Sequence, residues 1–139
     1  MSYDRIQAAL ETRMTQLVNS PKVVFENVKY EPTTNVPYLR TRFMPIDRRP
    51  ASCGIGSDLK PYMQYYYGLF QVVLNFPESQ GSRATNIMVA ELIDKFEAAT
   101  DLSFDGVYVT IKQIERMRGI NDGPWFKVPV NIYWHSYAR

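Results

Sequence analysis

The side chains best suited to catalysis in this chain are those of its single cysteine, Cys53, and its single histidine, His135. A thiol that passes its proton to a histidine becomes a strong nucleophile, so the two side chains could form a catalytic dyad. No hydrolase signature surrounds either residue, and Cys53 lies in a glycine-rich stretch far from His135. A metal site needs clustered ligands, which one histidine and one cysteine do not supply. We therefore predict no metal site and keep the dyad as the enzymatic alternative.

Other patterns match catalytic motifs only in part. The segment C-G-I-G-S at residues 53–57 lacks the lysine-serine ending and the strand-loop-helix context of a phosphate-binding loop. Glu91 and Asp94 are three residues apart on a predicted helix, where both carboxylates are expected to face solvent near Lys95. No G-x-S-x-G nucleophile elbow occurs. The sequence thus predicts a protein that is not an enzyme and binds no cofactor.

Positive charge is concentrated between residues 29 and 60, although the whole chain carries a formal net charge of only +2. A solvated edge strand and loop would explain this concentration, because cations on an edge oppose edge-to-edge aggregation. A surface for DNA or for an acidic protein would also explain it, and both interpretations stay open. The cations of the segment are Lys29, Arg40, Arg42, Arg48, Arg49 and Lys60, and its acids are Glu31, Asp47 and Asp58.

The whole chain has the length and composition of one globular domain, residues 1–139, with 45% hydrophobic and 22% charged residues. Its lone cysteine allows no intrachain disulfide and fits a reducing compartment. No segment resembles a signal peptide or a membrane span, so we expect a soluble, intracellular protein without a membrane partner. Ten tyrosines favour surfaces that are half buried and half wet, as protein interfaces are.

Two segments, residues 2–18 and 82–100, have the apolar periodicity of amphipathic helices. In the second, Ile87 lies away from the apolar stripe, on the side that carries Arg83 and Glu97. An exposed isoleucine beside alanines is a candidate contact for a neighbouring subunit. The apolar stripes are Tyr3, Ile6, Leu10, Met14 and Leu17 in the first helix, and Met88, Val89, Leu92, Phe96 and Ala99 in the second.

Five strands are predicted from runs of alternating apolar and polar residues, at 23–30, 38–46, 63–76, 107–117 and 125–137. The run Asn121-Asp122-Gly123 predicts a hairpin between the last two strands. Residues 47–61, with two prolines and two glycines, form the longest predicted irregular segment. The resulting order, α-β-β-β-α-β-β, predicts an α+β domain with two helices on one face of a single, mostly antiparallel sheet.

The segment F-Q-V-V-L-N-F-P-E-S-Q-G at residues 70–81 marks a junction between a strand and a helix. Phe70 belongs to an alternating apolar run, and Pro77 has no amide that could continue a sheet ladder. Gly81 precedes the second helix, and Gly68 within the strand predicts a bulge or a close backbone approach. These four residues mark a structural junction, with no nucleophile and no phosphate loop.

Several motifs follow one another along nearly the whole chain. They are Leu10 in the first helix, Phe25-Glu26-Asn27-Val28, P-Y-L-R at 37–40, Met44-Pro45, Gly68-Leu69-Phe70-Gln71-Val72 running into Pro77 and Gly81, Phe96 in the second helix, and Trp125 with V-P-V-N-I-Y-W at 128–134. In this order and spacing the chain resembles the bacteriophage tail terminator-like family, which includes tail completion proteins of lambda-like phages. The runs Y-Y-Y at 65–67 and R-R-P at 48–50 match no part of that pattern, so the resemblance assigns them no role.

The resemblance implies a structural protein in the virion of a long-tailed phage, assembled in the host cytoplasm. Proteins of this kind form a ring, typically a hexamer, on the head-proximal end of the tail tube. The ring ends tube polymerisation and presents the surface that joins the head. The implied partners are further copies of the chain, the tail tube protein and head-tail connector proteins, with DNA passing non-specifically through the lumen.

A ring requires two complementary lateral patches on each subunit, besides the surfaces that meet the tube and the connector. The candidates for the lateral interface are Tyr65 and Tyr67 of the tyrosine-rich strand, together with Ile87 of the second helix. The candidates for a surface that faces the tube or the lumen are the basic residues Arg40, Arg42, Arg48 and Arg49.

Besides the enzymatic alternative with Cys53 and His135, two other functions stay open at this point. A head-tail joining or neck adaptor protein is also a small ring component, and the sequence does not separate it from a terminator. A weak nucleic-acid-binding module would use the basic residues between positions 40 and 60, and its affinity for DNA would fall as salt rises.

Overall fold

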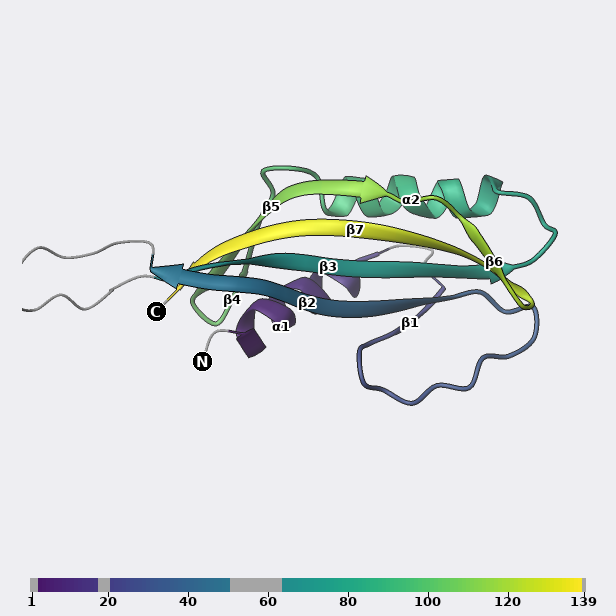
Figure 1. The fold of residues 1–139 in the computed structure, drawn as a ribbon, viewed down its shortest axis with the longest axis horizontal. Helices are drawn as coiled ribbons and strands as arrows, with labels where there is room; N and C mark the ends of the chain where they lie inside the picture. Colours follow the sequence, from purple (N-terminus) through teal and green to yellow (C-terminus); the bar gives the residue numbers. More distant parts are fainter. Residues whose placement is uncertain (1–2, 18–20, 51–63, 139) are drawn as a thin grey trace, which may run out of the picture.

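The computed structural model describes residues 3–17, 21–50 and 64–138, so Cys53 and the predicted irregular segment beyond Pro50 lie outside the described residues. Two helices and seven strands form the described chain (Figure 1). The helices are α1 (Tyr3–Met14) and α2 (Arg83–Lys95). The strands are β1 (Lys22–Val24), β2 (Tyr38–Pro50), β3 (Gln64–Pro77), β4 (Asp101–Phe104), β5 (Val107–Arg116), β6 (Ile120–Asp122) and β7 (Trp125–Ala138).

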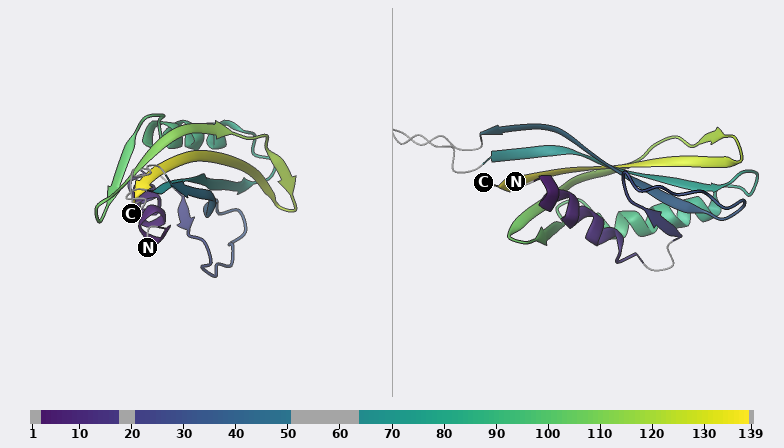
Figure 2. Two further views of the ribbon diagram at one scale, coloured as in Figure 1. Left: turned by 60° about the vertical axis from the view of Figure 1, so that its left-hand side comes forward. Right: turned by 90° about the horizontal axis from the view of Figure 1, so that it is seen from below.

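The strands pair in the order β1-β2-β3-β7-β5-β4, and β6 branches off by pairing with the beginning of β7. β1 runs parallel to β2, and the other pairs of described strands are antiparallel. The sheet curls, and both helices lie on its concave side (Figure 2). The convex side carries no helix of the described chain, and we call it the helix-free face.

β3 and β7 form the centre of the sheet and pair along their whole length, from Gln64 opposite Ala138 to Pro77 opposite Trp125. Every second residue of each strand is buried on the concave side, as the period of two in a strand requires. The large buried side chains are Tyr66, Phe70, Val72 and Leu74 on β3, and Val128, Val130, Ile132 and Trp134 on β7.

Aromatic side chains connect the layers of this core. Phe96, at the C-terminal end of α2, packs near Phe70, with ring centroids 6.3 Å apart. Phe43 of β2 stacks on Trp134 within the sheet, and Tyr3 of α1 meets the Phe43 ring edge-on, with centroids 6.4 Å apart. Full burial of one large apolar side chain contributes about 1.5–3 kcal/mol, so these residues hold the helices on the concave side.

The predicted α+β class, with two helices and a mostly antiparallel sheet, is confirmed. The predicted order of elements is incomplete, because it contains neither β4 nor β6. β4 has four residues of which one is buried, and the three residues of β6 are all exposed. β4, Asp-Leu-Ser-Phe, alternates polar and apolar residues but is only four residues long, and β6 has three residues, so neither run is long enough for the sequence to reveal it as a strand.

Several predicted element ends also differ from the structure. The strand predicted at residues 23–30 shrinks to β1, because the chain turns at Asn27, which has a left-handed φ of 61°. β2 continues to Pro50, into the predicted irregular segment, because its second half pairs with the beginning of β3. We call this paired extension, residues 47–50 of β2 with residues 64–67 of β3, the hairpin arm. Both helices end earlier than predicted, at Met14 and Lys95.

Gly68 lies where the backbone of β2 leaves no space for a side chain on β3. A Cβ atom at this position would lie 2.7 Å from the carbonyl oxygen of Met44, 2.8 Å from Cα of Pro45 and 2.8 Å from Cζ2 of Trp134. The register shift of this strand pair lies on β2, between Pro45 and Asp47. Glycine is thus required for the close approach, and the bulge belongs to the neighbouring strand.

Candidate interaction surface

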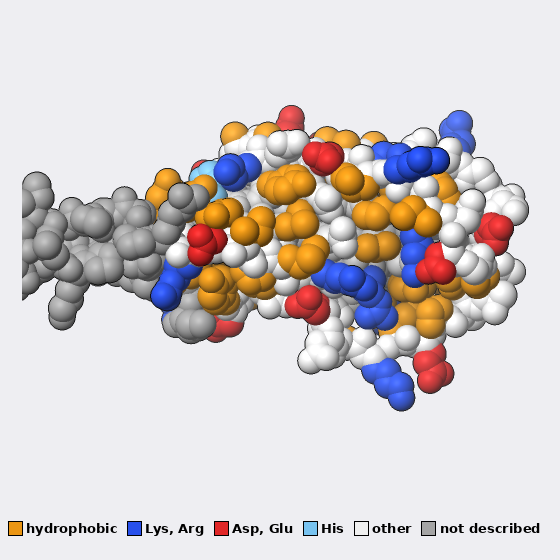
Figure 3. Space-filling view, viewed as in Figure 1, with side chains coloured by type: hydrophobic (Ala, Val, Ile, Leu, Met, Phe, Trp, Pro, Cys, Tyr) orange, Lys and Arg blue, Asp and Glu red, His pale blue; other side chains and the backbone are white. Residues whose placement is uncertain are grey.

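The helix-free face is built by the outward side chains of β2, β3, β7 and β5. Figure 3 shows this face, with apolar side chains along its middle and charged ones around them. At its centre, residues of the four strands pair in one row, which we call the central row: Met44, Leu69, Tyr133 and Gln113. An apolar sheet face without a covering layer is typical of a surface that meets another protein.

Aromatic rings of β3 and β7 gather on this face at the hairpin arm. We call this group the tyrosine cluster, and its members are Tyr65, Tyr67, His135 and Tyr137. The ring of Tyr65 lies 5.5 Å from that of Tyr67, 5.7 Å from that of His135 and 5.2 Å from that of Tyr137, measured between centroids. Tyr108 of β5 pairs with Tyr137, and these two side chains are 65% and 51% exposed. Aromatic side chains of this kind can bury a large area at a small cost in conformational entropy, as protein interfaces require.

His135 is the titratable residue of this cluster. Burial lowers the pKa of His135 below its usual 6.5, the positive charge of Lys112 acts in the same direction, and Asp101 partly offsets both. The Nδ1 atom of His135 is buried and has no hydrogen-bond partner among the described residues. The lowered pKa favours a neutral imidazole at pH 7, so the histidine of the cluster carries no charge there.

Four charged residues flank the central row. On β2, Arg42 lies on one side of the row and Asp47 on the other. On β5, Glu115 lies on the same side of the row as Arg42, and Lys112 lies on the same side as Asp47. Within the described residues, ion pairs join only Arg5 to Asp105 and Lys127 to Asp122, so these four charges are in no ion pair there.

The residues that the sequence predicted as contact sites fall on different surfaces. Arg40 and Arg42 of β2 share the helix-free face with Tyr65 and Tyr67 of β3. Ile87 lies on α2, on the other side of the sheet, and is 58% exposed. The two tyrosines and Ile87 therefore do not form one patch. The remaining two predicted residues, Arg48 and Arg49, lie on the hairpin arm, opposite Tyr66 and Tyr65 in the strand register.

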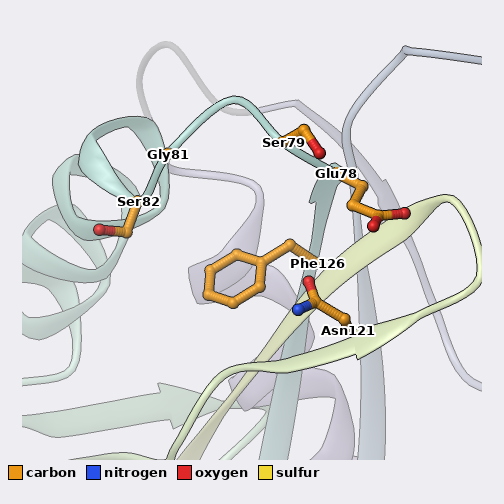
Figure 4. A pocket seen from close by; sticks show the side chains of 6 residues that line it. All are labelled: Glu78, Ser79, Gly81, Ser82, Asn121 and Phe126. Atoms are coloured by element: carbon orange, nitrogen blue, oxygen red, sulfur yellow. The ribbon is translucent and has the colours of Figure 1, made fainter.

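A pocket of about 360 Å³ lies at the junction of β3 and α2 (Figure 4). β3 ends at Pro77, and left-handed φ values of 66° at Ser79 and 74° at Gly81 turn the chain into the helix. The pocket was not predicted, because its lining residues come together only when β7 pairs with β3 on one side and with β6 on the other. Those residues are Glu78, Ser79, Gly81, Ser82, Asn121 and Phe126.

Among the described residues, no group of three or more histidine, cysteine, aspartate or glutamate side chains could hold a metal ion. None of the described helices has the length and apolarity that crossing a membrane requires. The absence of a metal, of a cofactor and of catalysis stays a prediction from the sequence.

A sheet with one helix-covered face and one uncovered, partly aromatic face defines the class of this protein: a small α+β domain suited to assembly with other proteins. A family model described as phage tail terminator protein matches residues 5–134, so the chain belongs to the phage tail terminator family. This confirms the resemblance found in the sequence. The family is a structural, non-enzymatic one, and membership assigns the chain to the virion tail, in contact with other tail components.

The fold also matches solved structures. One of them is 26% identical in sequence and superposes with a TM-score of 0.74, covering 100% of this chain and 97% of its own. The name of that protein states no function. No curated protein matches the chain.

Proposed function

We propose that the chain caps the head-proximal end of the tail tube in a long-tailed phage. Copies of it form a ring, typically a hexamer, in the host cytoplasm. The ring ends polymerisation of the tube and presents its other side to the head-tail connector. Family membership supports the terminator role, and the uncovered helix-free face is the observation that supports assembly through the protein surface.

A subunit of such a ring needs lateral patches that complement one another head to tail. Tyr65 and Tyr67 on the helix-free face and Ile87 on α2 lie on opposite sides of the sheet, which suits two patches of one heterologous contact. The tube or the lumen is contacted by the basic residues of β2 and its arm, Arg40, Arg42, Arg48 and Arg49. Four cations per subunit leave the lumen mildly basic, so DNA passes without tight binding.

The test is deletion of the gene from the phage, followed by electron microscopy of the lysate. Loss of a terminator leaves tube growth unchecked, so abnormally long tails without heads are expected. Expression of the wild-type chain in trans restores normal tail length. Tails of normal length beside filled, unjoined heads would instead identify a head-tail joining protein.

A further inference from the structure

The sheet has two open edges, one on β2 and one on β5. On β2, the outer side is paired with β1 only up to Arg40, and Pro45 has no amide hydrogen to donate. On β5, the outer side is paired up to Ile111, which exchanges backbone hydrogen bonds with the residues just before β4. The described residues supply no outer neighbour for residues 41–44 of β2 or residues 113–116 of β5. This stretch of β5 is exposed or half-buried, so its edge is accessible.

The two open stretches occupy the same rows of paired residues across the sheet. One of these rows is the central row, and the other three are Thr41-Val72-Val130-Arg116, Arg42-Gln71-Asn131-Glu115 and Phe43-Phe70-Ile132-Ile114. A second copy beside the first can therefore continue all four rows, from β5 of one copy into β2 of the next. Because β2 and β5 run in opposite directions, the new pair of strands is antiparallel.

The backbone groups of β5 point in the direction that this pairing needs. In an antiparallel ladder, successive residues turn their N–H and C=O groups to opposite sides of the strand. Met117 donates a backbone hydrogen bond to Pro129 of β7, so Met117 faces β7. Ile114 and Arg116 therefore turn their hydrogen-bonding groups to the open side of β5.

The same hydrogen bond determines which residues of β2 face its open side. Because Pro129 faces β5, Val130 faces β3 and exchanges hydrogen bonds with Val72. Val72 thus faces β7, so Thr41 opposite it faces away from β3, as does Phe43 two residues later. In the continued rows, the outward-facing residues of the two edges therefore meet one another.

The charges at the two edges are complementary. On the helix-free face, Glu115 shares a row with Arg42, so in the continued sheet it lies beside Arg42 of the next copy. Lys112 occupies the extra position of the bulge in β5 and lines one shallow hollow with Glu115, which places it on the same face. Asp47 follows the bulge of β2 on the same side of the central row, so it lies within reach of the long side chain of Lys112.

The other cations of the paired stretches do not face one another. Arg116 turns to the concave side, beside Thr41 of the next copy. On that side of β2 the cation is Arg48, six rows and about 20 Å further along the strand. Arg40 of the next copy is on the helix-free face, two rows from Glu115, where a diagonal neighbour of opposite charge is favourable.

The rest of each edge limits the contact to these rows. β1 covers β2 up to Arg40, and β5 ends at Arg116, which shares its row with Thr41. At the other end of the contact, Pro45 shares the row of Ile111, where the pairing on the β4 side begins. A bulge bends its strand, and the bulge of β2 after Pro45 lies where β4 of the neighbouring copy begins.

The charge of β2 also selects the partner. Two β2 edges paired with each other over residues 41–44 bring two copies of Arg42 into one contact that contains no acidic residue. The edge of β5 supplies Glu115 instead. The cations that discourage pairing between like edges therefore favour pairing with β5.

We propose that copies of the chain join edge to edge into one continuous sheet, with residues 113–116 of one copy antiparallel to residues 41–44 of the next. This inference rests on the ring proposed above and specifies its lateral contact. The contact joins two different edges, so it is heterologous, as a ring requires. It takes the place of the contact between the two tyrosines and Ile87, and it gives Arg42 a partner in the neighbouring copy.

Four residue pairs make a small contact compared with a stable interface, which buries on the order of 800 Å² per partner. We therefore expect the edges to pair when the tail holds the copies side by side at a high effective concentration. The tests accordingly use phage particles.

The first test exchanges the charges of one row. Phage lacking the gene is complemented with Arg42→Glu, with Glu115→Arg or with both changes, and infectious particles are counted. Each single change places like charges side by side at every junction and lowers the titre by at least about tenfold. The double variant restores the titre. Within one copy the two residues are on strands about 14 Å apart, so restoration reports a contact between copies. Asp94→Arg, on the exposed side of α2, is the control and leaves the titre unchanged.

The second test links the two edges covalently. Gln113 and Met44 of adjacent copies form a pair without hydrogen bonds, whose Cα atoms are about 4.5 Å apart, close enough for a disulfide. In a Cys53→Ser background, particles with Gln113→Cys and Met44→Cys yield a ladder of linked chains after oxidation. Either cysteine alone yields no link. Gln113→Cys with Arg40→Cys is the matched control, because Arg40 lies four residues, about 13 Å, from Met44.

The proposal is overturned if either single charge change is without effect, if the double variant is not restored, or if the cysteine pair gives no link. A link with Met44→Cys alone would also overturn it, because the β2 edge would then meet itself. Circular dichroism of the purified variants confirms that they fold. Gene deletion tests the terminator role separately. Linked chains together with normal tail length after deletion would retain the edge contact and refute the terminator role, and long tails without linked chains would do the reverse.

Discussion

At the scale of single residues, the sheet has room for a hydrogen atom at position 68 and not for a methyl group. In Gly68→Ala the new Cβ meets backbone atoms of Met44 and Pro45, which cannot rotate away. We expect a loss of about 1–3 kcal/mol in the free energy of unfolding, measured by urea denaturation. Gly119→Ala is the control, because its nearest contacts are atoms of the half-buried Phe126 ring, which can shift. Equal losses in the two variants would contradict this explanation.

His135 makes stability depend on pH in a defined direction. Its pKa is lowered in the folded chain, mainly by burial, so near pH 6 the unfolded chain binds more protons than the folded chain. The free energy of unfolding is therefore unaffected by His135 well above pH 6.5 and falls as the pH drops through 6.5 towards the lowered folded value. His135→Gln should flatten the profile between pH 7 and pH 5 in urea denaturation. Identical profiles for wild type and variant would refute this assignment.

At the scale of elements, the two sides of α2 differ in what they contribute. Phe96, at the C-terminal end of α2, is fully buried, whereas Ile87 points away from the sheet and is exposed. Phe96→Ala should cost about 3–5 kcal/mol of unfolding free energy, because it leaves a cavity between the helix and β3. Ile87→Ala should change stability by no more than about 0.5 kcal/mol. Thermal and urea denaturation check both, and a large loss in Ile87→Ala would mean that Ile87 is buried by a neighbouring copy.

The edge of the sheet explains part of the basic segment. β1 pairs with β2 only at Tyr38, Leu39 and Arg40, so the rest of β2 has no described neighbour on that side. A proline, a bulge and cations all occur on this open stretch, and each of them discourages edge-to-edge pairing. The structure thus supports the edge-strand interpretation, and it leaves the side chains of Arg40 and Arg42 available on the helix-free face.

At the scale of the whole molecule, the hairpin arm extends beyond the part of the sheet that the helices cover (Figure 2). The function proposed above assigns to the cations of this arm, Arg48 and Arg49, a contact with a component of the tail outside the subunit. Arg48→Glu combined with Arg49→Glu should reduce infectivity by at least about tenfold in a complementation assay, since like charges at a contact cost several kcal/mol. Arg116→Glu with Arg118→Glu, outside the arm, is the matched control. Normal infectivity of the arm variant would remove the basis for this assignment.

The sequence by itself determined the elements whose signals are local. The apolar stripe of α2 and the alternation along β3, β5 and β7 depend only on near neighbours in the chain. The three strands were predicted close to their observed bounds, and α2 was predicted with its correct beginning and too late an end. The family could also be inferred from the order of motifs along the chain. The α+β class followed from the same local signals.

Only the tertiary structure decided which residues share a surface. β4 and β6 exist because longer strands offer them a partner, and their four and three residues are too few to form a recognisable strand pattern. The packing of α2 on the concave side separates Ile87 from Tyr65 and Tyr67. The register between β2, β3, β7 and β5 arranges Arg42, Asp47, Lys112 and Glu115 about one row. That register is set by pairing between segments far apart in the chain. Because the stability of a strand pair depends on the side chains of both strands, neither strand alone reveals the register.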